Sequence, residues 1–289
     1  MILRTRYEQT EAHAREMAAC AEMVDADKCW HKETLDSYAA LNEFYKGYFS
    51  GATGKEFVRA TKAINDGSPI RILDFGAGRG ETSLYLADHG HTVFPVEPSY
   101  EFCQVIDHMS CRFGKNLTIY NSSAEHLDIS GVEFDIAIFN VSLHHCDDPL
   151  MALKNAYRLL RSGGTLLLVS EPMLPFFKSH EGMQRDLASA PEEFGHYGGN
   201  EHSYHHAEYV SMMRQAGFRN IKSEIVARYR SKDALKSSMA ADHRPPGVRK
   251  QLKYAYLNTT YLLERAKLKP LLHLMKVLSL VQLTFSASK

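Results

Sequence analysis

The residues best suited to bind a ligand gather around one glycine-rich turn. Asp74 ends an apolar run, Gly76, Gly78 and Gly80 follow in alternation, and Glu97 ends the next apolar run. Because glycine has no Cβ, a ligand can approach the backbone of such a turn closely. An acidic residue at the end of the neighbouring strand can accept hydrogen bonds from ribose hydroxyls. Residue type and spacing together predict half of a nucleoside-binding crevice.

The spacing of these glycines argues against a phosphate ligand. A dinucleotide-binding turn has the pattern G-x-G-x-x-G and places a pyrophosphate on a helix N-terminus. Here the pattern is one residue tighter, and the carboxylate of Asp74 would repel a phosphate. A ligand with a cationic end and no phosphate fits better. The alternative is a glycine-rich turn that binds nothing, because short glycine motifs recur by chance.

Side chains for acid–base chemistry follow the later apolar runs. The run 134–140 ends at Asn140, which can donate and accept hydrogen bonds, and a histidine pair comes next. Histidine titrates near neutral pH and can remove a proton from a hydroxyl acceptor. We expect His145 and His202 to be the catalytic residues, and a structural His145 that caps the following helix is the alternative. The full candidate set is His144, His145, Glu171, Glu201, His202 and His205.

Alternating strands and helices are needed to position these side chains. Apolar runs and glycine stops predict strands at 70–75, 92–97, 117–120, 134–140, 164–171 and 219–228. Helical patterns fall at 80–89, 99–113, 149–161 and 209–216. This order predicts an α/β fold whose parallel sheet is covered by helices on both faces.

Two further regions are expected to border the binding crevice. Residues 7–65 have a helix-favouring composition without proline and should form a helical cap that carries Tyr38, Tyr45 and Tyr48. Ordinary packing of the cap on the core is the plainer role for these tyrosines. Residues 172–205 are rich in proline, glycine, histidine and tyrosine, and they predict a structured substrate loop.

The C-terminal region has two interpretations. Residues 230–270 show helical patterns with a break at 245–247, and 270–285 combine leucines with His273 and Lys276. The second stretch is either an amphipathic membrane contact or a helix that leads to an antiparallel last strand at 278–286. We favour the helix and strand. The expected divisions are a cap at 1–66, a core at 67–230, and a helical insertion with the closing strand at 231–289.

The run from Leu73 to Gly80 resembles the first motif of class I S-adenosylmethionine-dependent methyltransferases. Asn140, segment 143–149 and the strand at 164–171 resemble the fourth- and fifth-strand region of that family, and 121–125 resembles its third-strand loop. The resemblance covers residues 68–228 and implies S-adenosylmethionine as the cofactor. It places Asp74 and the glycines at the methionine end, and Glu97 on the ribose. The cofactor-binding residues that it implies are Asp74, Gly76, Gly78, Gly80, Glu97, Ser123, Ala124, Asn140 and Tyr48.

The family resemblance also implies a fold and an activity. The fold is a Rossmann-like, doubly wound sheet of seven strands, the last antiparallel, with the N-terminal helical cap and the helical insertion. The activity is methyl transfer to a hydroxyl or amine of a small molecule or sugar, since the run 195–204 resembles bacterial glycan methyltransferases. Two alternatives stay open. One is a lyase or cyclase of the same fold that releases methylthioadenosine, with the cap tyrosines around the sulfonium, and the other is a cofactor-binding module without catalysis.

The composition of the chain narrows the functional classes to which it could belong. With 34 basic and 34 acidic residues among 289, no net charge attracts nucleic acid. The five cysteines lack a C-x-x-C pair and fit reduced thiols in the cytoplasm, and the charged N-terminus lacks a signal-peptide core. We expect no metal and no integral membrane segment. The histidine-rich loop offers a ligand set, but catechol-type methyltransferases hold magnesium with aspartate and asparagine oxygens. That set is His196, Glu201, His202, His205 and His206.

Overall fold

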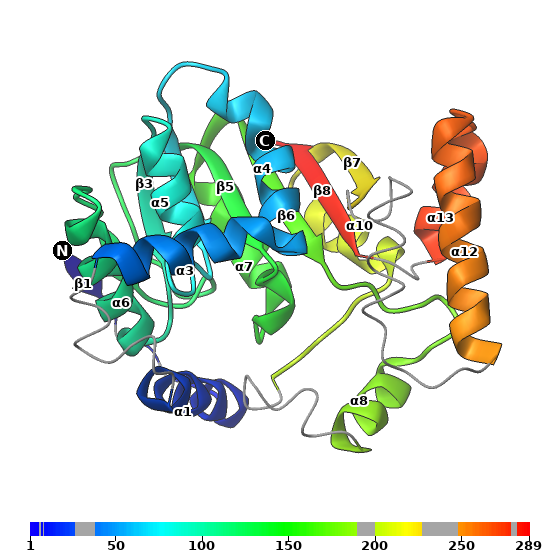
Figure 1. The fold of residues 1–289 in the computed structure, drawn as a ribbon, viewed down its shortest axis with the longest axis horizontal. Coiled ribbons are helices and arrows are strands. Elements are labelled where there is room, and N and C mark those ends of the chain that lie inside the picture. The colour runs from blue at the N-terminus through cyan, green and yellow to red at the C-terminus, as the bar shows by residue number, and fades with distance from the viewer. Residues whose placement is uncertain (6, 8, 27–37, 190–199, 227–247, 279–281) are drawn as a thin grey trace.

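The computed structural model describes residues 1–5, 7, 9–26, 38–189, 200–226, 248–278 and 282–289 of the chain. Its centre is a sheet, and the described residues form eight strands in the order β1-β4-β3-β2-β5-β6-β8-β7 (Figure 1). Neighbouring strands are parallel, except that β8 is antiparallel to both β6 and β7. The strands are β1 (Ile2–Arg4), β2 (Arg71–Phe75), β3 (Thr92–Val96), β4 (Ile119–Asn121), β5 (Phe134–Asn140), β6 (Leu160–Glu171), β7 (Arg219–Ile225) and β8 (Leu283–Ser288).

The strand side chains alternate between two hydrophobic clusters, because successive residues of a strand point to opposite faces. Ile72 and Ile136 belong to the cluster under α4 (Ala52–Asn65), α5 (Glu81–Asp88) and α6 (Tyr100–Arg112). Leu73 and Ala137 belong to the cluster under α7 (Pro149–Leu159) and α10 (His206–Gln215). The expected α/β fold, with helices on both faces and an antiparallel last strand, is confirmed.

Local capping signals fix where the helices near the strand ends begin. The Oγ of Ser99 accepts a hydrogen bond from the N–H of Phe102 at the start of α6. At the start of α7, Asp148 accepts one from the N–H of Met151, and Pro149 occupies the first turn. Such caps satisfy N–H groups that have no partner within the helix. They hold the loops after β3 and β5 in a defined path toward one edge of the sheet.

The remaining helices lie at the two ends of the chain and in the expected substrate loop. The cap contributes α1 (Glu11–Ala26), α3 (Tyr38–Ser50) and α4. The C-terminal region contributes α12 (Val248–Arg265) and α13 (Lys269–Leu278), which leads to β8 as expected. None of the helices in the described ranges is long and apolar enough to cross a membrane.

The structure differs from the sequence-based expectation in three places. Residues 2–4 form β1 beside β4, so the sheet has an eighth strand where only a cap was expected. A strand of three residues is too short to show a periodic pattern. The substrate loop contains α8 (His180–Ser189), and the last strand begins at Leu283 because α13 extends to Leu278. Segment 195–199 and the break at 245–247 lie outside the described residues.

Candidate active site

A cavity of about 500 Å³ lies at the carboxyl ends of β2, β3 and β5. Its wall includes the turn after β2, Glu97 after β3, Asn140 at the end of β5, and one face of α1. A volume of this size is typical of a small-molecule site. The strand order changes direction between β2 and β5, which is where sheets of this type bind their ligands.

The carboxylate of Glu97 holds the glycine-rich turn. Its Oε2 accepts a hydrogen bond from the backbone N–H of Gly78 at 2.8 Å, and its Oε1 accepts one from Ser99 at the same distance. A Cβ on Gly78 would meet no atom within 4 Å, so the backbone there faces open space. Burial raises the pKa of Glu97 to about 8, although both N–H groups act to lower it. Each carboxylate oxygen keeps a lone pair for a further donor.

Asp74 lies behind the turn and is not among the residues that line the cavity. Its Oδ2 accepts hydrogen bonds from the hydroxyls of Thr82 at 2.8 Å and Ser83 at 2.6 Å, which fixes the first turn of α5. Its Oδ1 is buried without a partner among the described residues, and burial raises the pKa of Asp74 to about 6. Gly80, the N-cap of α5, also lies behind the cavity wall. Glu81 instead lines the cavity here, and burial raises its pKa to about 7.

The other expected cofactor-binding residues reach the cavity. Gly76, Ser123, Ala124, Asn140 and Tyr48 all line it. The Nδ2 of Asn140 donates a hydrogen bond to the Tyr48 hydroxyl at 2.7 Å, which connects β5 to helix α3 of the cap. The Oδ1 of Asn140 is buried and has no partner among the described residues. A polar donor on a bound ligand would satisfy this oxygen.

The cap tyrosines Tyr45 and Tyr48 have different surroundings. Tyr48 lines the cavity, whereas the ring of Tyr45 packs against those of Phe49 and Phe113. The side chain of Tyr38 lies outside the described residues.

His144 is oriented by a buried carboxylate. Its Nδ1 lies 2.9 Å from Oε2 of Glu171, while Oε1 of Glu171 accepts hydrogen bonds from the backbone N–H groups of Ser142 at 3.0 Å and Leu143 at 3.1 Å. With these donors around it, Glu171 acts as an acceptor, and Nδ1 of His144 carries a proton. The Nε2 of His144 then faces Glu201, whose Oε2 is 3.5 Å away.

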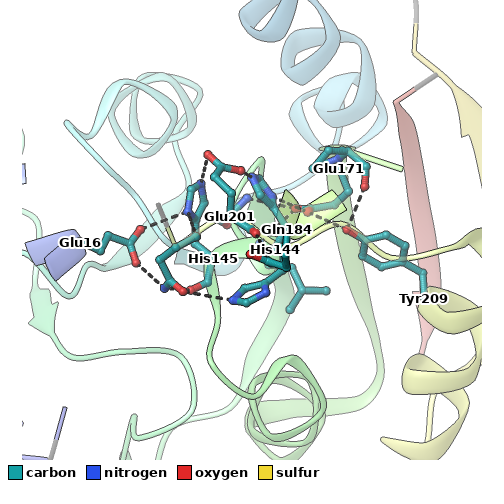
Figure 2. Close-up of polar contacts among 12 residues, drawn as sticks. Glu16, His144, His145, Glu171, Gln184, Glu201 and Tyr209 are labelled. Carbon is teal, nitrogen blue, oxygen red and sulfur yellow. Dashed lines mark hydrogen bonds and ion pairs between the residues drawn. The ribbon is translucent and has the colours of Figure 1, made fainter. Parts of the chain in front are cut away.

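His145 is oriented in a similar way, by the carboxylate of Glu16 on helix α1 of the cap. Its Nδ1 lies 3.1 Å from Oε1 of Glu16 and 3.0 Å from the carbonyl oxygen of Asn200. Two acceptors at Nδ1 keep the proton there, so the neutral ring carries its lone pair on Nε2, 3.8 Å from Glu201. Burial acts to lower the pKa of His145, but the hydrogen bond and charge of Glu16, helped by Glu201 and Asn200, raise it above the ordinary value. Figure 2 shows the resulting series of contacts from Glu16 to Glu171.

His202 lies beside this series and is not among the residues that line the cavity. Its backbone N–H donates to the carbonyl of His144 at 3.1 Å, and its Nε2 lies 3.1 Å from Oδ1 of Asn200. The Nδ2 of Asn200 in turn donates to Oε2 of Glu16 at 2.8 Å. Burial lowers the pKa of His202. The structure therefore brings His145 to the cavity and places His202 one contact further away.

Among the residues that the structure describes, two groups of side chains have the composition of a metal site. In each group the ligand atoms lie within 4.8 Å of one another, and only the first group lines the cavity. The groups are His144, His145 and Glu201, and His180, His205 and Glu208. The loop set considered from the sequence is not assembled in the described residues, because His206 contacts Ser223 and His196 lies outside those residues.

Helix α1 contributes cavity residues that were missing from the expectations. His13, Glu16, Met17 and Cys20 all line the cavity. Their spacing of three and four residues places them on one face of the helix. The sequence does show that these four residues share one helix face. It does not show which part of the protein that face contacts, so it could not assign them to the cavity.

Known proteins resemble this chain in sequence. A sequence model of the methyltransferase domain matches residues 51–223, which is more than half of the chain. The uncharacterized methyltransferase YcgJ of Bacillus subtilis is 27% identical over 156 residues, which are 52% of this chain and 62% of that protein. This match thus spans less than two thirds of the relative. The ubiquinone/menaquinone biosynthesis C-methyltransferase UbiE of Vibrio campbellii is 24% identical over 217 residues, 66% of this chain and 80% of that protein.

A solved structure shares the fold. Phosphoethanolamine N-methyltransferase 2 of Haemonchus contortus, in complex with phosphomonomethylethanolamine and S-adenosylhomocysteine, superimposes with a TM-score of 0.56. The match is 16% identical and covers 90% of this chain and 58% of that chain.

Proposed function

The chain belongs to the class I S-adenosylmethionine-dependent methyltransferases, and from this membership we propose that it methylates a hydroxyl or amine of a small molecule or sugar. The observation that carries the proposal is one cavity with two chemically unlike ends. The glycine turn and Glu97 form one end, and His144, His145 and Glu201 form the other. A cofactor and an acceptor placed in one cavity can react without diffusing apart.

The residues of the first end fit S-adenosylmethionine. In this assignment Glu97 accepts hydrogen bonds from the ribose hydroxyls, and Ser123 and Ala124 border the adenine. At the cavity, the buried Oδ1 of Asn140 has no partner among the described residues. Buried acceptors of this kind require a donor, and the ammonium of the cofactor's methionine end is one. The bare backbone at Gly78 leaves room for close approach.

S-adenosylmethionine supplies a methyl group that its sulfonium already activates, so this chain has to align the acceptor, exclude water and remove a proton. His145 takes that proton on Nε2, because Glu16 and Asn200 keep Nδ1 protonated. The carboxylates that raise the pKa of His145 also stabilise the imidazolium once it forms. His202 acts as a positioning residue through its contact with Asn200.

The acceptor end supports a polar substrate. Its lining side chains His13, Glu16, His145 and Glu201 supply both donors and acceptors, which suits a hydroxylated or amine-bearing molecule. UbiE is named as a C-methyltransferase of quinone biosynthesis, so quinols are the second class to test. We place the enzyme in the cytoplasm, because the described cysteines Cys20, Cys103, Cys111 and Cys146 are all free thiols.

Product analysis by mass spectrometry tests this function. The full chain is incubated with S-adenosylmethionine and single acceptors from a panel of sugars, amines and quinols, with a reaction lacking acceptor as control. We expect S-adenosylhomocysteine and a methylated product with one acceptor class. Methylthioadenosine in the control would instead indicate a lyase or cyclase, and cofactor binding without turnover on the whole panel would indicate a binding module.

A further inference from the structure

Helices α12 and α13 form one side of the molecule (Figure 1), and exposed apolar side chains lie on and between them and on the loop after β6. Six of the ten exposed large hydrophobic side chains among the described residues belong to this region. We call this region the α12–α13 surface and define it by Phe176, Phe177, Leu262, Leu268, Leu271 and Leu274. Their exposed fractions run from 46% for Leu268 to 68% for Phe177. Exposed apolar side chains gathered in one region usually mark an interaction site.

Helix α13 is anchored on the rest of the molecule. It contacts α12, α10 and β7, and its Met275 is buried. The hydroxyl of Tyr256 on α12 donates a hydrogen bond to the Met275 carbonyl. Leu271 and Leu274 are three residues apart, so they share one face, and that face is exposed by 49% and 53%. The helix therefore presents leucines outward from a fixed position.

The loop after β6 extends the same surface. The backbone N–H of Phe176 approaches the carbonyl of Leu278 at the end of α13, at 3.4 Å. This contact places Phe176 and its neighbour Phe177 at the C-terminal end of α13. Two elements distant in the sequence thus contribute aromatic and aliphatic side chains to one region.

The charges beside these apolar side chains are mainly basic, although Glu264 directly precedes Arg265. Arg265, Lys267 and Lys269 are exposed at the junction of α12 and α13. Residues 265–289 contain no aspartate or glutamate, although the whole chain has equal numbers of acidic and basic residues. A basic surface with outward leucines and phenylalanines has the composition of a peripheral membrane contact.

We propose that the α12–α13 surface docks on a lipid bilayer that carries anionic headgroups. The leucines and phenylalanines enter the boundary between headgroups and acyl chains, while Arg265, Lys267 and Lys269 contact the headgroups. A second copy of this chain is the less suitable partner. A twofold contact would bury the same mainly basic surface of both copies against each other, which like-charge repulsion opposes. Membrane docking is separate from the proposed methyl transfer, and its test requires no turnover.

Co-sedimentation with lipid vesicles tests the docking. The full chain is mixed with vesicles of phosphatidylcholine alone or of phosphatidylcholine with phosphatidylglycerol, at low and high salt. We expect binding to the anionic vesicles that weakens as salt increases, because salt screens the charges. The variant Leu271→Asp with Leu274→Asp should bind on the order of tenfold more weakly or worse. Each of Arg265→Gln, Lys267→Gln and Lys269→Gln should weaken binding roughly fivefold.

A matched control and a second measurement keep the outcomes separate. Met151 is 45% exposed on α7, outside this surface, so Met151→Asp should leave vesicle binding unchanged. The glutamine variants alter exposed side chains only, so they report on docking even if the leucine variant folds poorly. Equal binding to neutral and anionic vesicles, no binding to either, or full binding by the glutamine variants would overturn the proposal. A leucine variant that converts a dimer into a monomer in light scattering would reassign the surface to self-association.

Discussion

Removal of the Glu97 carboxylate gives the sharpest test of the cofactor site. In Glu97→Ala the backbone N–H groups of Gly78 and Ser99 both lose an acceptor at 2.8 Å, so the glycine turn loses its anchor. The proposed ribose hydroxyls lose the same carboxylate. Hydrogen bonds to a charged group contribute about 1.5 to 3 kcal/mol each. Loss of two such bonds to the ribose should therefore weaken the binding free energy of the cofactor by about 3 kcal/mol or more. This corresponds to an increase in Kd of roughly a hundredfold.

Isothermal titration calorimetry with S-adenosylmethionine measures this change. Glu97→Gln keeps one carbonyl oxygen but turns an amide toward the other N–H group, so its affinity should fall between those of the wild type and Glu97→Ala. Glu133→Ala is the control, because Glu133 is exposed just before β5, at the opposite end of that strand from the cavity. Thermal denaturation of each variant shows whether the fold persists, so that lost affinity is not lost structure.

The pH dependence of binding adds an independent check. The pKa of Glu97 is about 8, and the ionised carboxylate is the form that accepts both hydroxyls, so wild-type affinity should increase from about pH 7 to 9. Glu97→Gln has no such group and should lose this part of the dependence. Unchanged affinity in a folded Glu97→Ala, or the same pH profile in Glu97→Gln, would refute the ribose assignment.

Three other perturbations test the acid–base assignment, the turn and the absence of a metal. His145→Ala should lower kcat roughly hundredfold with cofactor affinity intact, and wild-type kcat should rise with pH through a midpoint above the ordinary histidine pKa, because the raised pKa must be exceeded before Nε2 can accept a proton. Full turnover in His145→Ala would place the base elsewhere. Gly80 and Gly90 have φ of 88° and 89°, but only at Gly80 would a Cβ lie 2.9 Å from the Ile106 side chain. In urea denaturation Gly90→Ala should therefore cost about 1 to 2 kcal/mol and Gly80→Ala about 1 to 3 kcal/mol more, and equal losses would contradict the packing argument. Treatment with EDTA should leave turnover unchanged if the Nε2 of His145 acts as a base, whereas a loss that zinc or manganese restores would make the histidine–glutamate cluster a metal site.

The frame of the site could be predicted because its signals are local. The strand β2, the glycine turn and α5 follow each other within about twenty residues of sequence. Ser123, Ala124 and Asn140 also reached the cavity, since each follows or ends a strand whose carboxyl end lies at the same edge of the sheet. The strand β1 could not be predicted, because it is three residues long and pairs with β4 more than a hundred residues away.

The roles within the histidine cluster could not be read from local patterns. His145 and His202 are equally plausible bases by residue type, but only His145 lines the cavity, and His202 contacts it through Asn200. Asp74 matched a binding motif, yet its carboxylate accepts hydroxyl donors from α5 and sits behind the wall. Glu81, in the same turn, faces the cavity instead. The direction in which each side chain points depends on helix rotation and packing.

The sequence by itself determined the cofactor frame, since alternating apolar runs and glycines at fixed spacing specify strand, turn and helix without help from distant residues. The sequence also determined which polar residues follow the ends of the strands. Only the tertiary structure decided that Glu16 of the cap holds His145 and that Glu171 holds His144. These contacts join separate elements, so they depend on how α1 packs over the sheet and how β6 pairs with β5. Packing of that kind results from the whole set of buried surfaces, and no short stretch of sequence encodes it.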